Sequence, residues 1–380
     1  MSHGSDDPAA KPRIMVDVRK IEDSGIGTYI RNIVPRVVRR LPNCRFLLLG
    51  SRDRIAHRMS GADNHAIVEC GVRPLSTREQ LQLPRYIPRR IDVFWATHFN
   101  IPLVYSGRLV ATIHDIMPMA TPELSGGRLH GLYTRVMTAA LRYKRARIIS
   151  VSDFTASELA RLARIPRDCV TTIHEAADAS WSRVAPRSNP RPRPYLLTVG
   201  LVKPHKNLIA LLKAFDLLRE RWPHDLVIVG DRDRIVTRDT ECERFALRFG
   251  DRVVFTGRVS DVEIEQYFAH ADALVLPSLY EGFGLPAVEA MACGCPVVAS
   301  RAASLPEVCG DAAQQFDPRN PADIAAAVSR CIGSPDERAR MIEAGRRQAA
   351  RFSWDRAADE TAALLAEMCG LTGNREEPRL

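Results

Sequence analysis

Residues 273–300 constrain the fold of this chain more than any other stretch, because a short apolar run leads into a glycine-containing turn and then a helix. The run at 273–277 suits a strand that is buried on both faces of a parallel sheet. Gly282 and Gly284 let the backbone bend sharply and approach a ligand closely, and Pro286 suits the first turn of a helix. The turn should therefore lie at the carboxyl edge of a parallel sheet.

Two carboxylates, Glu281 and Glu289, lie on either side of this turn. Unpaired amide groups and the positive end of the helix dipole favour an anion there, such as a diphosphate. The carboxylates would repel that anion unless they bind hydroxyl groups, which a sugar ring and a ribose supply. Taken singly, each glutamate also fits a helix cap or a solvated helical face. Taken together, the pattern favours a nucleotide-sugar site.

Length and composition favour a two-domain enzyme of the cytoplasm. The chain has 380 residues, 46% of them hydrophobic, which exceeds what one core usually holds. Residues 1–12 are polar and lack the apolar core of a signal peptide, and no apolar run approaches membrane-spanning length. The 9 cysteines are scattered without the Cys and His spacings of a zinc site, so reduced and mostly buried thiols are expected.

The positive charge of the chain is concentrated in its first half. Residues 1–190 hold 29 Lys and Arg against 17 Asp and Glu, a net +12, and the remaining 25 against 28 give −3. No zinc finger, aromatic-studded RNA motif or basic tail indicates nucleic-acid binding. A helix expected near residues 128–149 places apolar side chains beside Arg135 and Arg142, which would suit an anionic membrane surface. From sequence alone, an ordinary amphipathic helix packed on its sheet is the favoured interpretation.

Four prolines between residues 186 and 194 mark the domain boundary, because they fall in a polar run that precedes a fresh apolar segment. The predicted divisions are residues 1–186, residues 187–354 and residues 355–380. The last of these holds a helix that should pack back toward the first domain, followed by a frayed tail.

Strand-like and helix-like segments alternate on both sides of this boundary. Before it, strands are expected at 13–18, 46–49, 93–96, 109–113 and 148–151, and helices at 27–40 and 129–144. After it, strands are expected at 195–199, 225–229, 253–256 and 274–277, and helices at 207–221, 261–270 and 354–368. Such alternation is typical of parallel, doubly wound sheets. The predicted fold class is α/β, with two doubly wound Rossmann-like domains facing a central cleft.

Further polar groups converge on that cleft. Lys203 and Lys206 follow the strand at 195–199, where an ammonium can neutralise a diphosphate and the charge that builds on a leaving group. Lys203 is interpreted as a solvated loop lysine. In the first half, Asp17 ends a strand, Gly25 and Gly27 open a helix, and His114 and Asp115 follow the strand at 109–113.

These motifs resemble those of the retaining glycosyltransferases of family 4, the group 1 glycosyltransferases. Glu281 and Glu289 fall on the acidic positions of the family's E-x7-E signature, and Lys206 falls on the lysine of its Gly-(Arg or Thr)-x-x-Pro-x-Lys segment. The chain departs from the family at Leu201 and His205, where many members have arginine. This departure leaves two alternatives: phosphate binding is weaker, or His205 substitutes. Gly25 and Gly27 match the family's glycine loop, and His114 with Asp115 matches its His-Asp pair.

The resemblance implies a GT-B fold and transfer with retention of configuration. Glu281 would hold sugar hydroxyls, Glu289 the ribose and Lys206 the diphosphate, and Glu281, Lys206 and His114 would be the catalytic residues. The implied donor site also includes Gly25, Gly27, His205, Val259, Gly282, Phe283, Gly284 and Leu285, and the implied acceptor side holds Asp17, His114 and Asp115. Because the departing diphosphate can itself take the acceptor's proton, no metal, cofactor or separate base is expected.

The combination of motifs looks most like the bacterial mannosyltransferases of surface polysaccharide assembly, including lipopolysaccharide. GDP-mannose is then the expected donor and a UDP-sugar the alternative. The acceptor would be a lipid-linked or other oligosaccharide at the inner face of the cytoplasmic membrane. Two rival classes remain open: a sugar-nucleotide 2-epimerase of the same fold, which would need acidic groups facing C2 from both halves, and a non-catalytic carbohydrate-binding scaffold.

Overall fold

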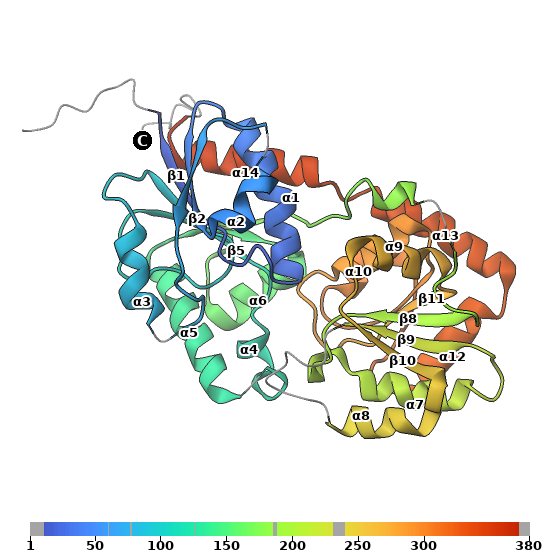
Figure 1. Ribbon diagram of the computed structural model, residues 1–380. Helices are drawn as coiled ribbons and strands as arrows, with labels where there is room; N and C mark the ends of the chain where they lie inside the picture. The colour runs from blue at the N-terminus through green and yellow to red at the C-terminus, as the bar shows by residue number, and fades with distance from the viewer. Residues whose placement is uncertain are drawn as a thin grey trace, which may run out of the picture.

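The structure is a computed structural model that describes residues 11–371, except residues 60, 77, 126, 185–187 and 231–239. Two parallel sheets, each flanked by helices, lie side by side in Figure 1. Strands of the first sheet end at Thr172, and those of the second begin at Tyr195. The α/β class with two Rossmann-like units is thus confirmed.

The first sheet has seven parallel strands in the order β3-β2-β1-β4-β5-β6-β7. They are β1 (Arg13–Asp17), β2 (Arg45–Gly50), β3 (His65–Glu69), β4 (Val93–Ala96), β5 (Arg108–Ile113), β6 (Arg147–Ser150) and β7 (Val170–Thr172). Ile14, Met15 and Val16 of β1 are fully buried, as expected for a strand covered on both faces. Strand order reverses between β1 and β4, and ligands bind outside the carboxyl ends of strands at such a switch point.

The second sheet has six parallel strands in the order β10-β9-β8-β11-β12-β13. They are β8 (Tyr195–Val199), β9 (Asp225–Val229), β10 (Val253–Gly257), β11 (Ala273–Leu276), β12 (Val297–Ser300) and β13 (Ala313–Phe316). The switch point lies between β8 and β11. The turns that carry Lys206 and Glu281 therefore leave neighbouring strands at the same sheet edge.

The helices of the first unit are α1 (Gly25–Arg40), α2 (Arg52–Ile55), α3 (Glu79–Gln82), α4 (Met117–Ala120), α5 (Arg128–Tyr143) and α6 (Asp153–Ala163). Those that follow are α7 (Leu208–Leu218), α8 (Thr240–Ala246), α9 (Asp261–His270), α10 (Leu285–Cys293), α11 (Leu305–Cys309), α12 (Pro321–Ile332), α13 (Pro335–Ala349) and α14 (Trp354–Met368). Side-chain oxygens of Ser152, Ser260 and Asn320 accept backbone amides at the starts of α6, α9 and α12, which fixes where these helices begin. Within the described ranges, no helix combines the length and apolar content that crossing a bilayer requires.

Four strands were absent from the sequence-based assignment. Three of them, β3, β7 and β13, are edge strands whose residues are mostly half-buried. Such strands need little apolar content, so their sequences carry no clear period. The fourth, β12, is interior but only 4 residues long.

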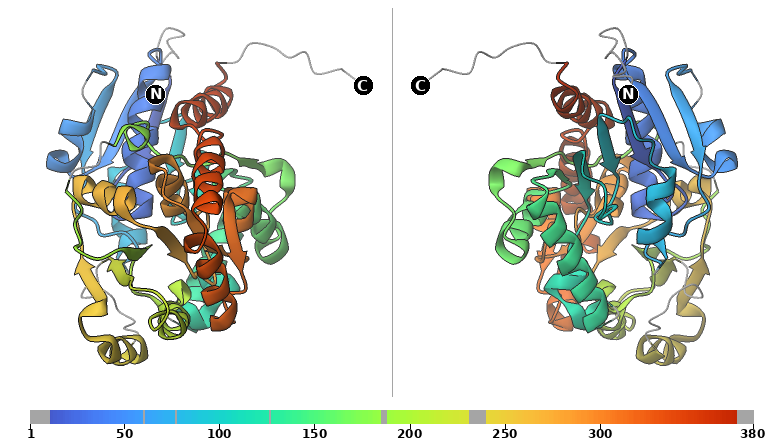
Figure 2. Two further views of the ribbon diagram at one scale, coloured as in Figure 1. Left: turned by 90° about the vertical axis from the view of Figure 1, so that its right-hand side faces the viewer. Right: turned by 90° about the vertical axis from the view of Figure 1, so that its left-hand side faces the viewer.

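The last helix, α14, returns to the first unit, where it packs on α1 (Figures 1 and 2). Arg40 of α1 bonds Asp355 at 2.9 Å and Asp359 at 2.5 Å. The buried Trp354 ring meets the edge of Tyr29, with ring centroids 6.0 Å apart. One apolar cluster runs from β1 through this contact to β11, so the two units share part of their core.

Candidate active site

Glu281 and Lys206 form the centre of the site. Lys206 Nζ lies 2.6 Å from Glu281 Oε1, and the Ser278 hydroxyl donates to the same oxygen at 2.6 Å. Burial alone would raise the pKa of Glu281, but the charge and hydrogen bond of Lys206, with the bond from Ser278, lower it. The sheet thus brings the predicted lysine and glutamate together as an ion pair.

The turn before α10 presents free amide groups. Gly284 precedes α10 with φ +103°, a conformation that favours glycine. The helix has no side-chain cap, and Pro286 lies in its first turn. The amides of Gly282, Phe283 and Gly284 donate to no acceptor in the part of the chain that the structure describes. An anion next to Leu285 at the helix start would find these donors and the helix dipole.

Gly282 also touches the first unit. A Cβ at this position would lie 1.8 Å from the carbonyl oxygen of His114, so only glycine permits this approach. The hydroxyls of Ser152 and Thr155 donate to the Gly282 carbonyl at 2.5 and 3.2 Å. The turn that carries Glu281 and Gly282 in the second unit therefore lies directly against the turn that carries His114 and Asp115 in the first unit.

The His114 ring is held at both nitrogens. Nδ1 lies 3.0 Å from Glu175 Oε1, and Nε2 lies 3.0 Å from the carbonyl oxygen of Thr97. The edge of the Tyr29 ring packs against the imidazole, with centroids 5.0 Å apart. The carboxylate of Asp115 accepts the amide of Met117 at 2.9 Å and so shapes the start of α4.

The other residues predicted in the first unit differ in their surroundings. Gly25 and Gly27 lie in the first turn of α1, and the space around a Cβ on Gly25 is open. Asp17, expected on the acceptor side, is only 1% exposed. Burial would raise the pKa of Asp17, but Arg19, whose Nη2 and Nε lie 2.5 and 2.8 Å from its two oxygens, lowers it. Arg19 thus folds back onto Asp17 and binds both of its carboxylate oxygens, and the acceptor-side role of Asp17 stays a prediction.

Comparison with known proteins identifies the family. The family model for glycosyl transferases group 1 matches residues 183–348, and that for glycosyltransferase family 4 matches residues 24–181. The O-antigen chain mannosyltransferase B of Escherichia coli is 31% identical over 376 residues, which cover 89% of this chain and 94% of that protein. The chain belongs to the group 1 glycosyltransferases. The serotype-specific mannosyltransferase WbdA of Escherichia coli is 27% identical over 263 residues, 65% of this glycosyltransferase and 32% of WbdA.

Solved structures confirm the GT-B fold. Sucrose-phosphate synthase from Thermosynechococcus elongatus superposes with a TM-score of 0.75 at 18% identity, covering 96% of this glycosyltransferase and 100% of that chain. The Anabaena protein Alr3699/HepE, solved in complex with UDP-glucose, gives 0.72 at 19% identity over 93% and 99% of the two chains.

The remaining residues predicted on the donor side, Glu289 and Val259, follow strands of the second sheet. Glu289 of α10 forms no hydrogen bond or ion pair with any described residue, and burial, with the charges of Asp261 and Glu175, raises its pKa to about 7. Val259 lies between β10 and α9, and its amide and carbonyl bond to nothing in the described ranges. Both residues have polar groups left for a ligand.

The structure shows the surroundings of Lys203 and His205, whose donor-side roles stay predictions. His205 is 8% exposed, and burial, with the charge of Lys206, lowers its pKa to about 4. Its ring is therefore neutral near pH 7 and replaces no arginine charge. Lys203 was interpreted as solvated, yet burial, and the charge of Lys206, lower its pKa. It forms no ion pair with a described residue, which leaves its ammonium for an anion.

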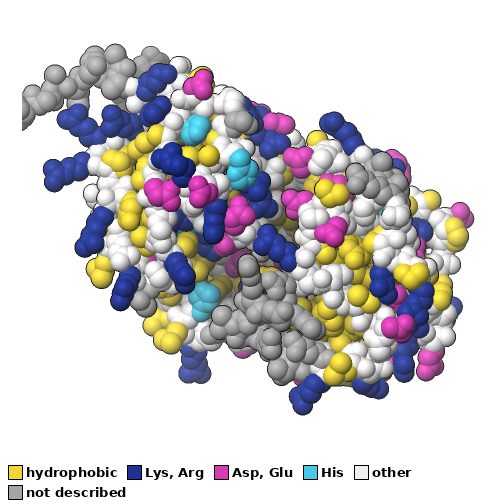
Figure 3. Space-filling view, in the orientation of Figure 1, with side chains coloured by type: hydrophobic (Ala, Val, Ile, Leu, Met, Phe, Trp, Pro, Cys, Tyr) yellow, Lys and Arg dark blue, Asp and Glu magenta, His cyan; other side chains and the backbone are white. Residues whose placement is uncertain are grey.

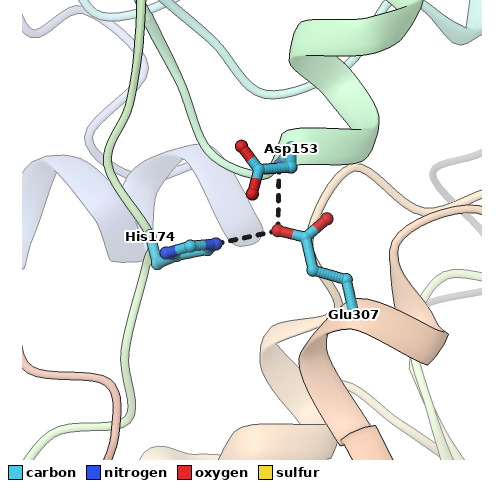
Figure 4. Close-up of side chains that lie close together, drawn as sticks. All are labelled: Asp153, His174 and Glu307. Atoms are coloured by element: carbon cyan, nitrogen blue, oxygen red, sulfur yellow. Dashed lines mark hydrogen bonds and ion pairs between the residues drawn. The ribbon is translucent and has the colours of Figure 1, made fainter.

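Two functional candidates, Glu175 and Glu307, were not among the predicted site residues. Figure 4 shows Glu307 of the second unit beside His174 and Asp153 of the first. Its carboxylate accepts the Asp153 amide at 2.8 Å and lies 2.8 Å from His174 Nε2. These three side chains could reach one metal ion, and they are the one such trio within the described residues. Because Glu307 already accepts hydrogen bonds on both oxygens, the trio is better described as a contact between the units.

Proposed function

We propose that this glycosyltransferase transfers mannose from GDP-mannose, with retention of configuration, to a lipid-linked or oligosaccharide acceptor in surface polysaccharide synthesis. The observation that carries the proposal is the Glu281–Lys206 pair beside the free amides of the α10 turn. The names of the Escherichia coli relatives support mannose as the sugar and a polysaccharide as the product.

The donor diphosphate would lie between Lys206, Lys203 and the amides of residues 282–284. Two ammonium groups and a helix N-terminus offset most of the charge that builds on the departing diphosphate. This positive charge supports transfer without a metal ion. With a diphosphate bound, Lys206 would share its hydrogen bonds between the ligand and Glu281.

Glu281 and Glu289 would accept hydrogen bonds from the hydroxyl groups of the donor. Glu281 is fixed by Lys206 and Ser278 through one oxygen, Oε1, which leaves Oε2 to accept a sugar hydroxyl. Glu289, which lacks a partner, would accept the ribose hydroxyls. The free amide and carbonyl of Val259 would meet the base.

Retention requires no enzymic base in this proposal. The departing diphosphate oxygen takes the proton of the acceptor hydroxyl as the new glycosidic bond forms on the same face of the sugar. The residues of the chain hold the diphosphate and the sugar in the geometry that this front-face exchange needs. His114 would contact the sugar or the acceptor from the first unit.

Helix α5 supports an acceptor at a membrane surface. Leu129, Leu132, Val136 and Tyr143 lie along one side of the helix and are 83%, 58%, 47% and 90% exposed. Arg128, Arg135 and Arg142 are exposed on the same helix. Apolar side chains flanked by arginines suit an interface with anionic lipid. Figure 3 shows further basic side chains spread over the first unit.

The shift in thermal unfolding with GDP-mannose, GDP, UDP-glucose and UDP, each with and without EDTA, tests the donor. A ligand at 100 times its Kd should stabilise the protein by about 2.7 kcal/mol. We expect a shift with the guanine compounds that EDTA does not remove and that Glu281→Gln reduces. A shift confined to the uracil compounds would identify a UDP-sugar as the donor instead of GDP-mannose. No shift with any of these compounds would favour a non-catalytic scaffold.

A further inference from the structure

His174 and Glu175 are adjacent residues just after β7, and they contact opposite sides of the junction between the first and second units. Glu175 is 4% exposed and bonds Nδ1 of His114 inside the first unit. His174 bonds Glu307 on α11 of the second unit, with His174 Nε2 2.8 Å from Glu307 Oε1. This two-residue segment therefore joins the predicted catalytic histidine to the contact between the units.

Glu307 also caps a helix across the junction. Its carboxylate accepts the amides of Asp153 and Phe154, the first residues of α6, at 2.8 and 2.9 Å. A carboxylate at a helix N-terminus is stabilised by the free amides and by the helix dipole. The cap and the His174 bond use the same carboxylate, so both exist only while α11 lies against α6.

The hydrogen bonds of His114 fix where its ring hydrogen lies. The Thr97 carbonyl can only accept, so Nε2 carries a hydrogen. Nδ1 then either donates to an ionised Glu175 or accepts from a protonated one. In both cases the bond to Glu175 sets the orientation of the ring and keeps Nε2–H as the group that faces an oxygen acceptor.

We propose that Glu175 is a positioning residue that holds His114 as an Nε2–H donor for the donor sugar or acceptor, and that Glu307 keeps Glu175 in place through His174. This inference rests on the proposed glycosyl transfer. On sugar binding, Nε2–H would share its hydrogen between the Thr97 carbonyl and a substrate oxygen, while Nδ1 stays on Glu175. The side chain of Glu175 itself touches no substrate.

Kinetics of five variants test this arrangement: Glu175→Gln, Glu307→Gln, His114→Asn and the double variants of Glu175→Gln with His114→Asn and with Glu307→Gln. Glu175→Gln should lower kcat by about tenfold with little change in the KM for the sugar nucleotide. In the His114→Asn background the same change should have almost no further effect, because Glu175 acts through the ring. Glu307→Gln should lower kcat in the same way and combine with Glu175→Gln less than multiplicatively.

The control is Glu343→Gln, the same chemical change at an exposed site on α13, which should leave kcat and unfolding unchanged. Imidazole ¹⁵N spectra give an independent readout: the His114 signals, assigned from their loss in His114→Asn, should shift in Glu175→Gln and in Glu307→Gln. Multiplicative effects of Glu175→Gln and His114→Asn, or unmoved His114 signals, would overturn the proposal. Isothermal titration of the wild type with GDP-mannose distinguishes a failure of this positioning role from a failure of the proposed function. A wild type that does not bind this sugar nucleotide would contradict the proposed function itself.

Discussion

Glu281 is an anion in the free protein, because Lys206 and Ser278 hold one of its oxygens. Glu281→Gln keeps the size of the side chain and removes the charge, so the sugar and the lysine both lose their best partner. We expect kcat/KM to fall by at least about 100-fold, in line with the loss of a charged group at a reacting centre. Thermal unfolding should move little, because the amide oxygen of the glutamine can still accept hydrogen bonds from Lys206 and Ser278.

A badly destabilised Glu281→Gln would contradict this prediction and favour a structural role as a turn-fixing residue. Glu343→Gln serves again as the matched change. Activity with the sugar nucleotide and the unfolding midpoint, measured on the same preparation, separate the two interpretations.

Glu289 should make both stability and donor binding depend on pH. Its pKa is raised from 4.5 to about 7 in the folded protein, so between these values the folded state holds a proton that the unfolded state has lost. This contribution to stability is complete below pH 4.5 and is lost as pH rises through about 7. Donor binding should run the other way, because an ionised carboxylate accepts ribose hydroxyls better than a neutral carboxyl.

The measurement is the Kd of GDP-mannose between pH 6 and pH 8 in the wild type and in Glu289→Gln. GDP-mannose is preferred to GDP, whose terminal phosphate titrates at about pH 6. The wild-type affinity should rise with pH, and the affinity of the variant should stay flat. An equal slope in both proteins would assign the titration to another group.

The sequence alone predicted the part of the candidate site whose residues lie in short local motifs. Lys206 and Glu281 each follow a short buried strand, and the parallel sheet then places them at one edge. Glu175 and Glu307 could not be found in this way, because their partners His114 and Asp153 lie 61 and 154 positions away along the chain. A glutamate in a loop or on a short helix carries no local signal for such a contact.

At the scale of elements, helix α5 exposes a row of large apolar side chains to solvent. Leu132→Asp should weaken binding to vesicles of phosphatidylglycerol and phosphatidylethanolamine by roughly tenfold or more, because it removes an apolar contact and adds repulsion. Leu217→Asp on α7 is the matched control, since Leu217 is similarly exposed on the second unit. Vesicle sedimentation at low and high salt measures the effect.

Binding that salt does not weaken would contradict an electrostatic contribution from the arginines of α5. Equal losses in Leu132→Asp and Leu217→Asp would assign the vesicle contact to a general surface property. The sequence indicated an amphipathic helix here, but it could not show which apolar residues the sheet would cover. Met137 and Leu141 face inward and are buried, whereas Leu129 and Leu132 face outward.

At the scale of the whole molecule, α14 joins the two units through packing more than through charge. Trp354→Ala should destabilise the protein by about 3 kcal/mol or more, because it empties a buried site against Tyr29. Arg40→Ala removes bonds to Asp355 and Asp359, which are mostly exposed, and should cost less than about 1 kcal/mol. The midpoints of urea unfolding for the two variants compare these contributions, and equal shifts would show that the indole contributes little.

The return of α14 to α1 also bears on how the protein is made. The surface of α1 against which α14 packs is synthesised early, and the helix that covers it emerges from the ribosome only after the whole second unit. Domains generally begin to fold during synthesis, starting from the N-terminal end. The first unit must therefore wait, with an apolar face uncovered beside Tyr29, until residue 368 has been added. During that interval this apolar face is open to association with other chains.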